Sequence, residues 1–136
     1  MSHSPKSILI VEDDGLMRAS LARQFTEAGY AVTAAADGEE AVKALDHETP
    51  DVVLCDIILP KLDGIEVLEY AMAQWPEKHI PFIMLTTSDD IGTVARAMDK
   101  GALAYLLKSD NQIDVVVKVV ETKLGLSPRA TAEGAP

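Results

Sequence analysis

The sequence predicts an α/β domain in which five parallel strands alternate with five helices. Three observations indicate this architecture. Short apolar runs rich in β-branched residues recur along the chain, and each is followed by a stretch with apolar residues at helical spacing. No segment is repeated. Because parallel strands need crossover connections that cover both faces of the sheet, we expect a doubly wound (βα)5 domain within the 136 residues.

Each predicted strand is a short apolar run that stops at turn residues or at polar side chains. The first run is the clearest, because it is β-branched and ends at the acids Glu12 and Asp13. The second run is the weakest of the five. The strands are expected at residues 7–11, 30–34, 51–55, 80–85 and 102–107.

Each strand is followed by an amphipathic stretch with capping residues at its ends. Asp14 is placed to cap the first helix, and Gly29 is placed to end it. Asp63, which we interpret as a cap, opens the third helix together with Gly64, and Pro76 closes it. The helices are expected at residues 16–28, 39–45, 64–73, 91–100 and 112–124.

The last helix is predicted from its apolar stripe and not from its composition. Residues 113–120 are rich in β-branched side chains, which favour a strand. Residues 109–111 nevertheless offer helix-capping side chains, and the apolar residues recur at helical spacing. That stripe consists of Ile113, Val116, Val117, Val120 and Leu124. Val115 and Val119 lie outside this stripe. They either pack at the edge of the helix or form a surface that binds a partner or a second copy of the chain.

The composition narrows the function classes. Twelve basic and 22 acidic residues give a net charge of −10, which argues against direct binding of nucleic acid or of a membrane. One cysteine excludes an internal disulfide and fits a reducing compartment. No run is long enough to span a bilayer and the start lacks a signal peptide, so a cytoplasmic protein is expected. We expect one folded domain at residues 7–125, between disordered ends at 1–6 and 126–136.

Polar side chains stand at the carboxyl ends of four predicted strands. They are Glu12 and Asp13, Asp56, Thr86 and Lys108. The ends of parallel strands share one edge of the sheet, where open α/β sheets bind ligands. Three carboxylates brought together repel one another, and a hard divalent ion with oxygen ligands, most plausibly Mg²⁺, would relieve that repulsion.

The same edge predicts phosphoryl chemistry. Asp56 can act as a nucleophile, as carboxylates do when they form aspartyl phosphates. Lys108 would place a point charge on the phosphoryl oxygens, and Thr86 would donate its hydroxyl to them. Cys55 precedes Asp56 but points to the opposite face by strand alternation, so we expect a core side chain there and not a reactive thiol.

Taken together, these motifs resemble one family. They are Glu12-Asp13 after the first strand, Asp56 through Asp63-Gly64 after the third, Thr86-Thr87 after the fourth, and the run from Gly101 to Lys108. In this order and at strand ends, they are similar to the receiver domains of response regulators in two-component signalling, the CheY-like family. The resemblance covers residues 7–124.

The resemblance implies more than the spacing does. The sheet order would be 2-1-3-4-5, as in flavodoxin-like and CheY-like folds. Asp56 would accept the phosphoryl group from a histidine kinase or a phosphotransfer protein. Asp13, Asp56 and the backbone carbonyl of Ile58 would bind Mg²⁺, assisted by Glu12.

The resemblance also implies a switch. Thr86 and Tyr105 would rearrange on phosphorylation and change a protein-interaction surface built from the fourth helix, the fifth strand and the fifth helix. Output would then pass through protein contacts or phosphate relay, and the resemblance leaves room for a homodimer that forms on phosphorylation.

The chain departs from the family pattern at two positions. Ser109 stands where the family usually has a proline, often after a cis bond. Because a cis bond before a residue other than proline costs about 2.5–4 kcal/mol, we expect a trans bond between Lys108 and Ser109. Ile58 stands where many relatives are polar, and we expect it to hinder the water that hydrolyses the phosphoryl group.

Other classes fit these residues less well. An FMN protein needs a phosphate-binding loop after the first strand, where this chain has acids, and neither a P-loop nor a dinucleotide motif occurs. A Mg²⁺-dependent phosphatase of the haloacid dehalogenase type needs a second Asp where Ile58 stands. We therefore expect no enzyme activity beyond the gain and loss of its own phosphoryl group. The remaining alternative is a receiver-like interaction module that is never phosphorylated.

Overall fold

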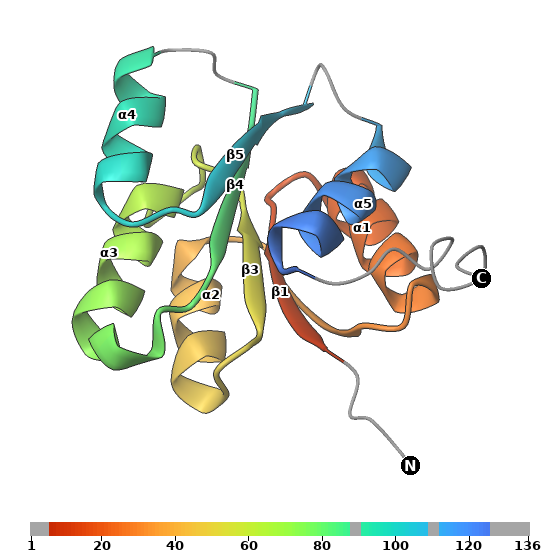
Figure 1. Ribbon diagram of the computed structural model, residues 1–136, viewed down its shortest axis with the longest axis horizontal. Helices are drawn as coiled ribbons and strands as arrows, with labels where there is room; N and C mark the ends of the chain where they lie inside the picture. The colour runs from red at the N-terminus through yellow and green to blue at the C-terminus, as the bar shows by residue number, and fades with distance from the viewer. Residues whose placement is uncertain (1–5, 88–90, 109–111, 126–136) are drawn as a thin grey trace.

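The computed structural model describes residues 6–87, 91–108 and 112–125, and it confirms the predicted α/β architecture (Figure 1). One parallel sheet has the strand order β2-β1-β3-β4-β5, as the resemblance implies. The strands are β1 (Ser7–Val11), β2 (Ala31–Ala35), β3 (Val52–Cys55), β4 (Phe82–Thr86) and β5 (Ala104–Leu107). The helices are α1 (Gly15–Glu27), α2 (Gly38–His47), α3 (Gly64–Gln74), η1 (Pro76–Lys78), α4 (Ile91–Asp99) and α5 (Ile113–Lys123).

Helices cover both faces of the sheet. In Figure 1, α1 and α5 lie on one side of the strands, and α2, α3 and α4 lie on the other. Each face buries its own apolar core, one containing Phe25 and Val116 and the other Leu68 and Met84. Cys55 is fully buried in the second core, which confirms its expected packing role. Burial of β1, β3 and β4 on both faces explains why these strands appear in the sequence as continuous apolar runs.

Some element boundaries differ from the prediction by one or two residues. β2 begins one residue late, because the Tyr30 N–H donates to the Phe25 carbonyl at 2.9 Å and so belongs to the turn that closes α1. β4 begins after Pro81 and not at Ile80, because proline has no N–H to give to the ladder. β5 also begins two residues late, and the short helix η1 is an element that the sequence did not predict.

The predicted caps of α1 and α3 are confirmed. The Oδ1 atom of Asp14 accepts hydrogen bonds from the N–H groups of Leu16 at 3.0 Å and Met17 at 3.4 Å. Asp63 and Glu66 form a reciprocal capping box in which each side chain accepts from the other's N–H at 2.9 Å. These short-range bonds fix the start of both helices next to the carboxyl edge of the sheet.

The apolar stripe of α5 packs against the sheet as predicted, with Val116, Val117 and Val120 buried. Val115 lies on the outer side with 39% of its surface exposed. The two chain ends, the residues expected to cap α5 and the peptide bond between Lys108 and Ser109 lie outside the described residues. Among the described helices, none is both long and apolar enough to cross a bilayer.

The Tyr30 hydroxyl gives a prediction about alkaline stability. It is buried beside Phe25, and within the described residues it has no hydrogen-bond partner. Burial, with a smaller effect of the Glu121 charge, raises the pKa of Tyr30 from 10.0 to about 12. The folded state therefore holds this proton more tightly than the unfolded state does. The stabilisation is complete below pH 10 and is lost as the pH rises towards 12.

Between pH 9 and 12, we expect the free energy of unfolding of the parent to fall by about 2–3 kcal/mol more than that of a variant without the Tyr30 hydroxyl. This difference corresponds to the shift of the Tyr30 pKa from 10.0 to about 12. The measurement is urea unfolding at each pH, with Tyr30→Phe as the reference. A parent and a variant with the same pH dependence would contradict the prediction, because the other two tyrosines are common to both proteins.

Candidate functional site

Register brings the predicted acids to one level of the sheet. Val11 and Cys55 are paired across β1 and β3, and the N–H of Asp56 donates to the Val11 carbonyl at 2.9 Å. Glu12 follows Val11 directly, and its N–H donates to the Ala35 carbonyl of β2 at 3.1 Å. The two acids therefore leave neighbouring strands side by side, as the parallel topology predicts.

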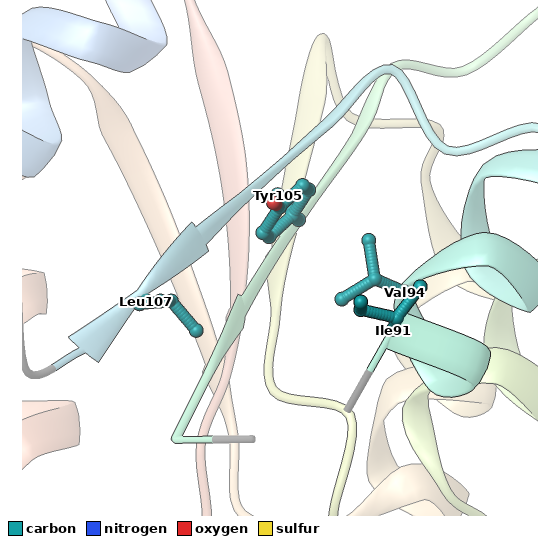
Figure 2. Close-up of a pocket in the computed structure, with 4 residues that line it drawn as sticks. All are labelled: Ile91, Val94, Tyr105 and Leu107. Atoms are coloured by element: carbon teal, nitrogen blue, oxygen red, sulfur yellow. The ribbon is translucent and has the colours of Figure 1, made fainter. Parts of the chain in front are cut away.

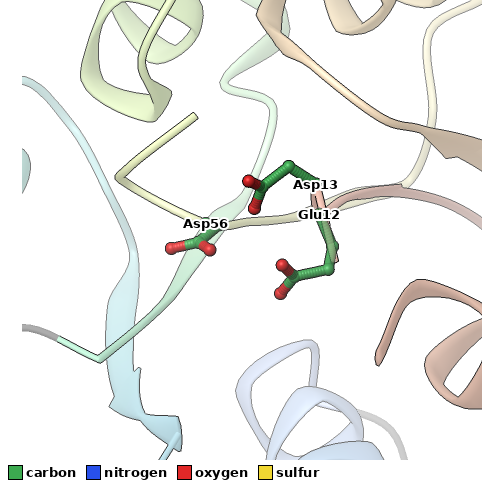
Figure 3. Close-up of side chains that lie close together, drawn as sticks. All are labelled: Glu12, Asp13 and Asp56. Atoms are coloured by element: carbon green, nitrogen blue, oxygen red, sulfur yellow. The ribbon is translucent and has the colours of Figure 1, made fainter. Parts of the chain in front are cut away.

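Three carboxylates gather at this edge (Figure 3). Glu12, Asp13 and Asp56 each offer an oxygen, and these oxygens all lie within 4.8 Å of one another. Glu12 and Asp56 are buried, with 1% and 6% of their surface exposed, whereas Asp13 is exposed. Two negative groups are thus held away from water, which is stable only if a cation is close.

Lys108 supplies one such cation. Its ammonium donates to Asp56 Oδ2 at 2.8 Å and lies 2.6 Å from Glu12 Oε1, although the angles at that second oxygen are not those of a hydrogen bond. Only 16% of the Lys108 side chain is exposed. One residue after β5 therefore reaches past β4 and bridges the acids that follow β1 and β3.

Burial and charge shift the pKa values of this pair. Burial disfavours the ionised form of Glu12 and raises its carboxyl pKa, although Lys108 and the Asp14 N–H counteract part of that effect. Burial also disfavours the charged form of Lys108, but the nearby carboxylates of Asp56 and Glu12 outweigh burial and raise the pKa of the ammonium. Lys108 is therefore charged at neutral pH and remains a counter-ion for the acids.

Two residues that support the site were not predicted from the sequence. Arg18 of α1 donates from Nη1 to the carbonyls of Glu12 at 2.8 Å and Asp13 at 3.4 Å, which ties the acidic loop to the first helix. Gly64 lies against the segment that follows β3, since a Cβ atom there would come within 2.1 Å of the Asp56 carbonyl oxygen. Its N–H donates to the Ile57 carbonyl at 2.7 Å.

Three further candidate residues are Thr86, Ile58 and Tyr105. Thr86 is the buried last residue of β4 and is paired with Leu107, which directly precedes Lys108. Ile58 lies two residues after Asp56 and has 63% of its surface exposed. Tyr105 lies apart from the carboxylate cluster. It is 43% exposed and lines a groove between β5 and α4, where Figure 2 shows it beside Ile91 and Val94.

The residues present fit a divalent metal ion. All three clustered groups are hard oxygen donors, which Mg²⁺ prefers. When ionised, three carboxylates against the single ammonium of Lys108 leave two negative charges uncompensated. The Oε1 atom of Glu12 is also buried without a hydrogen bond in the described part of the chain. The charge balance and the donor type therefore both agree with a divalent ion.

Comparison with known proteins gives the family. A response regulator receiver domain model matches residues 8–120. The transcriptional regulatory protein PdtaR of Mycobacterium tuberculosis is 38% identical over 114 residues, which are 82% of this chain and 54% of that protein. The PhoP alkaline phosphatase synthesis regulator of Bacillus subtilis is 36% identical over 117 residues, 85% of this chain and 48% of PhoP. The chain spans about half the length of these curated relatives.

Solved structures agree with this assignment. A CheY-like receiver domain protein from Methanospirillum hungatei superposes with a TM-score of 0.83 at 30% identity, over 90% of this chain and 95% of that one. A response regulator structure from Chloroflexus aurantiacus gives 0.80 at 33% identity, over 89% and 98% of the two chains. The chain therefore belongs to the response regulator receiver domain family of two-component signalling, whose members take phosphoryl groups from histidine kinases.

Proposed function

We propose that Asp56 of this chain accepts a phosphoryl group from a histidine kinase or a phosphotransfer protein. The observation that carries the proposal is the position of its carboxylate, buried among acids and 2.8 Å from the Lys108 ammonium. Mg²⁺ would be held by Glu12, Asp13, Asp56 and the backbone carbonyl of Ile58. We place the protein in the cytoplasm, where a buried free thiol such as Cys55 stays reduced.

The chemistry assigned to each side chain follows from its place. A carboxylate oxygen of Asp56 attacks the phosphorus atom, the new O–P bond forms as the P–N bond to the donor histidine breaks, and the imidazole keeps the electron pair. Lys108 moves its hydrogen bonds from the acids to the phosphoryl oxygens, and the Thr86 hydroxyl donates to one of them. Bound Mg²⁺ would supply charge neutralisation. The chain acts on no other substrate.

The first test is phosphorylation by a small donor. With Mg²⁺ and acetyl phosphate, we expect the intact mass to rise by one phosphoryl group, and we expect no rise for Asp56→Asn or in the presence of a chelator. Equal labelling of Asp56→Asn would disprove the acceptor. No labelling by acetyl phosphate or by histidine kinases would favour the alternative, an interaction module that is never phosphorylated.

Ile58 gives a test of the phosphorylated lifetime. Ile58 follows the acceptor by two residues and is 63% exposed, and we infer that its apolar side chain hinders the water that would reach the acyl phosphate on Asp56. We expect Ile58→Asn to hydrolyse faster by up to about tenfold, which corresponds to about 1.4 kcal/mol in the barrier. The measurement is the decay of the phosphorylated mass after removal of the donor. Ile91→Asn, at a residue of α4 that is 82% exposed, is the control, and an unchanged or slower decay in Ile58→Asn would refute the role.

The output of phosphorylation is assigned to the face formed by α4, β5 and α5. Thr86 and Tyr105 would rearrange together and alter the groove of Ile91, Val94, Tyr105 and Leu107 (Figure 2). A downstream protein, or a second copy of the chain, would then bind this face. The exposed Tyr105 ring supports this role, because its position leaves room for a change in orientation.

A further inference from the structure

A cavity of about 260 Å³ lies between the loop that follows Asp56 and helix α4. Its apolar lining comes from Ile57, Ile58, Leu59 and Ile65, and its charged lining comes from Asp63 and Arg96. We call it the seam pocket, because it continues the line along which α3 and α4 pack. It is distinct from the groove that contains Tyr105.

The two charges of the seam pocket differ in what they bind. Asp63 is occupied, because its Oδ1 accepts the Glu66 N–H at 2.9 Å in the capping box of α3. The guanidinium of Arg96 forms neither an ion pair nor a hydrogen bond with any residue that the structure describes. The pocket therefore combines an apolar lining with a cation that has no acidic partner in the described part of the chain, and the whole chain has a net charge of −10.

An ion pair directly after the end of α4 serves as a comparison. Lys100 lies four residues after Arg96 on the same seam, and its ammonium is 3.0 Å from the Glu69 carboxylate of α3. Where α3 would supply the corresponding acid for Arg96, the chain has the cavity and the apolar side chain of Ile65. Among the described residues no carboxylate pairs with Arg96, so its guanidinium can receive one from a partner.

The openness of the pocket favours a protein segment over a free small molecule. Ile58 lines the pocket with 63% of its surface exposed, so an occupant keeps one side towards solvent. Small-molecule sites bury about 70–90% of their ligand, whereas the exposed Ile58 leaves one side of this pocket open. A protein segment instead covers the exposed rim with its neighbouring residues and adds contact area.

We propose that the seam pocket is a docking site for a partner-protein segment that places a large apolar side chain in the cavity and an adjacent Asp or Glu carboxylate on Arg96. The apolar group covers Ile58 and Ile65, and the carboxylate completes the row of charge pairs that Lys100 and Glu69 begin. Because Ile57 and Ile58 directly follow Asp56, the bound segment lies next to the acceptor.

The test uses a displayed library of random heptapeptides selected on the immobilised protein. We expect the enriched peptides to share a large apolar residue within a few positions of an acid. Their affinity should fall by about tenfold or more on Arg96→Glu and on Ile58→Ser. It should change by less than about twofold on Lys118→Glu, which makes the same charge change at an exposed position of α5. Thermal unfolding of each variant verifies that it is folded.

Four outcomes of the selection and of its variants would overturn the proposal. They are an absence of enriched peptides, enriched peptides without acids, binding that Arg96→Glu leaves intact, and binding that is lost on Tyr105→Ser instead. Competition by 4-phenylbutyrate as strong as by the peptides would also overturn it, because a free carboxylate would then suffice. Acetyl phosphate labelling of Arg96→Glu is expected to equal that of the parent, so a failure of this proposal is distinguishable from a failure of phosphorylation at Asp56.

Discussion

Replacing Lys108 with methionine is expected to slow phosphorylation of Asp56 by acetyl phosphate by about 10²–10³-fold, the usual loss when one preorganised donor to a developing charge is removed. The ammonium that now lies 2.8 Å from Asp56 would no longer be available to the phosphoryl oxygens. The variant keeps a side chain of similar length, so the effect reports the charge and not a cavity.

The same substitution should separate stability from activity. Without Mg²⁺, the buried carboxylates of Glu12 and Asp56 would lose their counter-ion, and we expect the free energy of unfolding to fall by about 3 kcal/mol. With Mg²⁺ most of that loss should be recovered, because the ion binds only the folded state and binds more tightly once the competing ammonium is gone. Phosphorylation in the presence of Mg²⁺ should nevertheless remain slow, because the ion does not replace the ammonium at the phosphoryl oxygens.

Two measurements check this pair of expectations: denaturant unfolding with and without Mg²⁺, and calorimetric titration of the ion. Lys100→Met is the matched control, because its ion pair with Glu69 lies at the surface and should contribute at most about 1 kcal/mol. Weaker Mg²⁺ binding in Lys108→Met than in the parent would contradict the assignment of Lys108 as the internal counter-ion.

Replacing Gly64 with alanine is expected to destabilise the domain by about 3 kcal/mol, as overpacking against the backbone does. The added Cβ atom would stand 2.1 Å from the Asp56 carbonyl oxygen and 2.9 Å from the Ile57 Cα. Both neighbours are backbone atoms, so no flexible side chain can move aside. Either α3 or the acceptor segment has to shift, and we therefore expect phosphorylation of Asp56 to slow as well.

Gly15→Ala is the matched control for this substitution. A Cβ atom at Gly15 would meet only the end of the Arg18 side chain, at 3.7 Å, which is an ordinary contact. Because alanine favours a helix more than glycine does, this variant should be as stable as the parent or more stable by up to about 1 kcal/mol. Equal stabilities of the Gly64→Ala and Gly15→Ala proteins in urea would show that the close approach at Gly64 does not constrain the fold.

The local caps and the strand ends that carry the acids could be predicted from the sequence. The caps Asp14 and Asp63 bond to N–H groups within three residues, and the acids after β1 and β3 converge because parallel strand ends share one edge. The strand order itself came from family resemblance. The start of a strand was predicted wrongly where it depended on a hydrogen bond outside the strand, as at Tyr30.

The site details that the sequence did not predict depend on contacts between distant residues. Nothing local indicates that Arg18 turns back to the carbonyl of Glu12, because an arginine in the first turn of a helix is usually solvated. Gly64 was expected only as a helix start, since its closeness to Asp56 depends on how α3 packs. The orientation of Arg96 towards a cavity likewise depends on the packing of α3 and α4.

The bridge made by Lys108 also bears on how the domain is synthesised. Glu12 and Asp56 belong to the first half of the chain, whereas Lys108 follows the last strand. A ribosome therefore releases both acids well before it releases their counter-ion, although a domain generally folds as one unit. A nascent chain that ends after β4 holds an uncompensated pair of carboxylates and an unpaired sheet edge. The completed fold thus becomes stable in a late step, when β5 is added and its lysine reaches the acids.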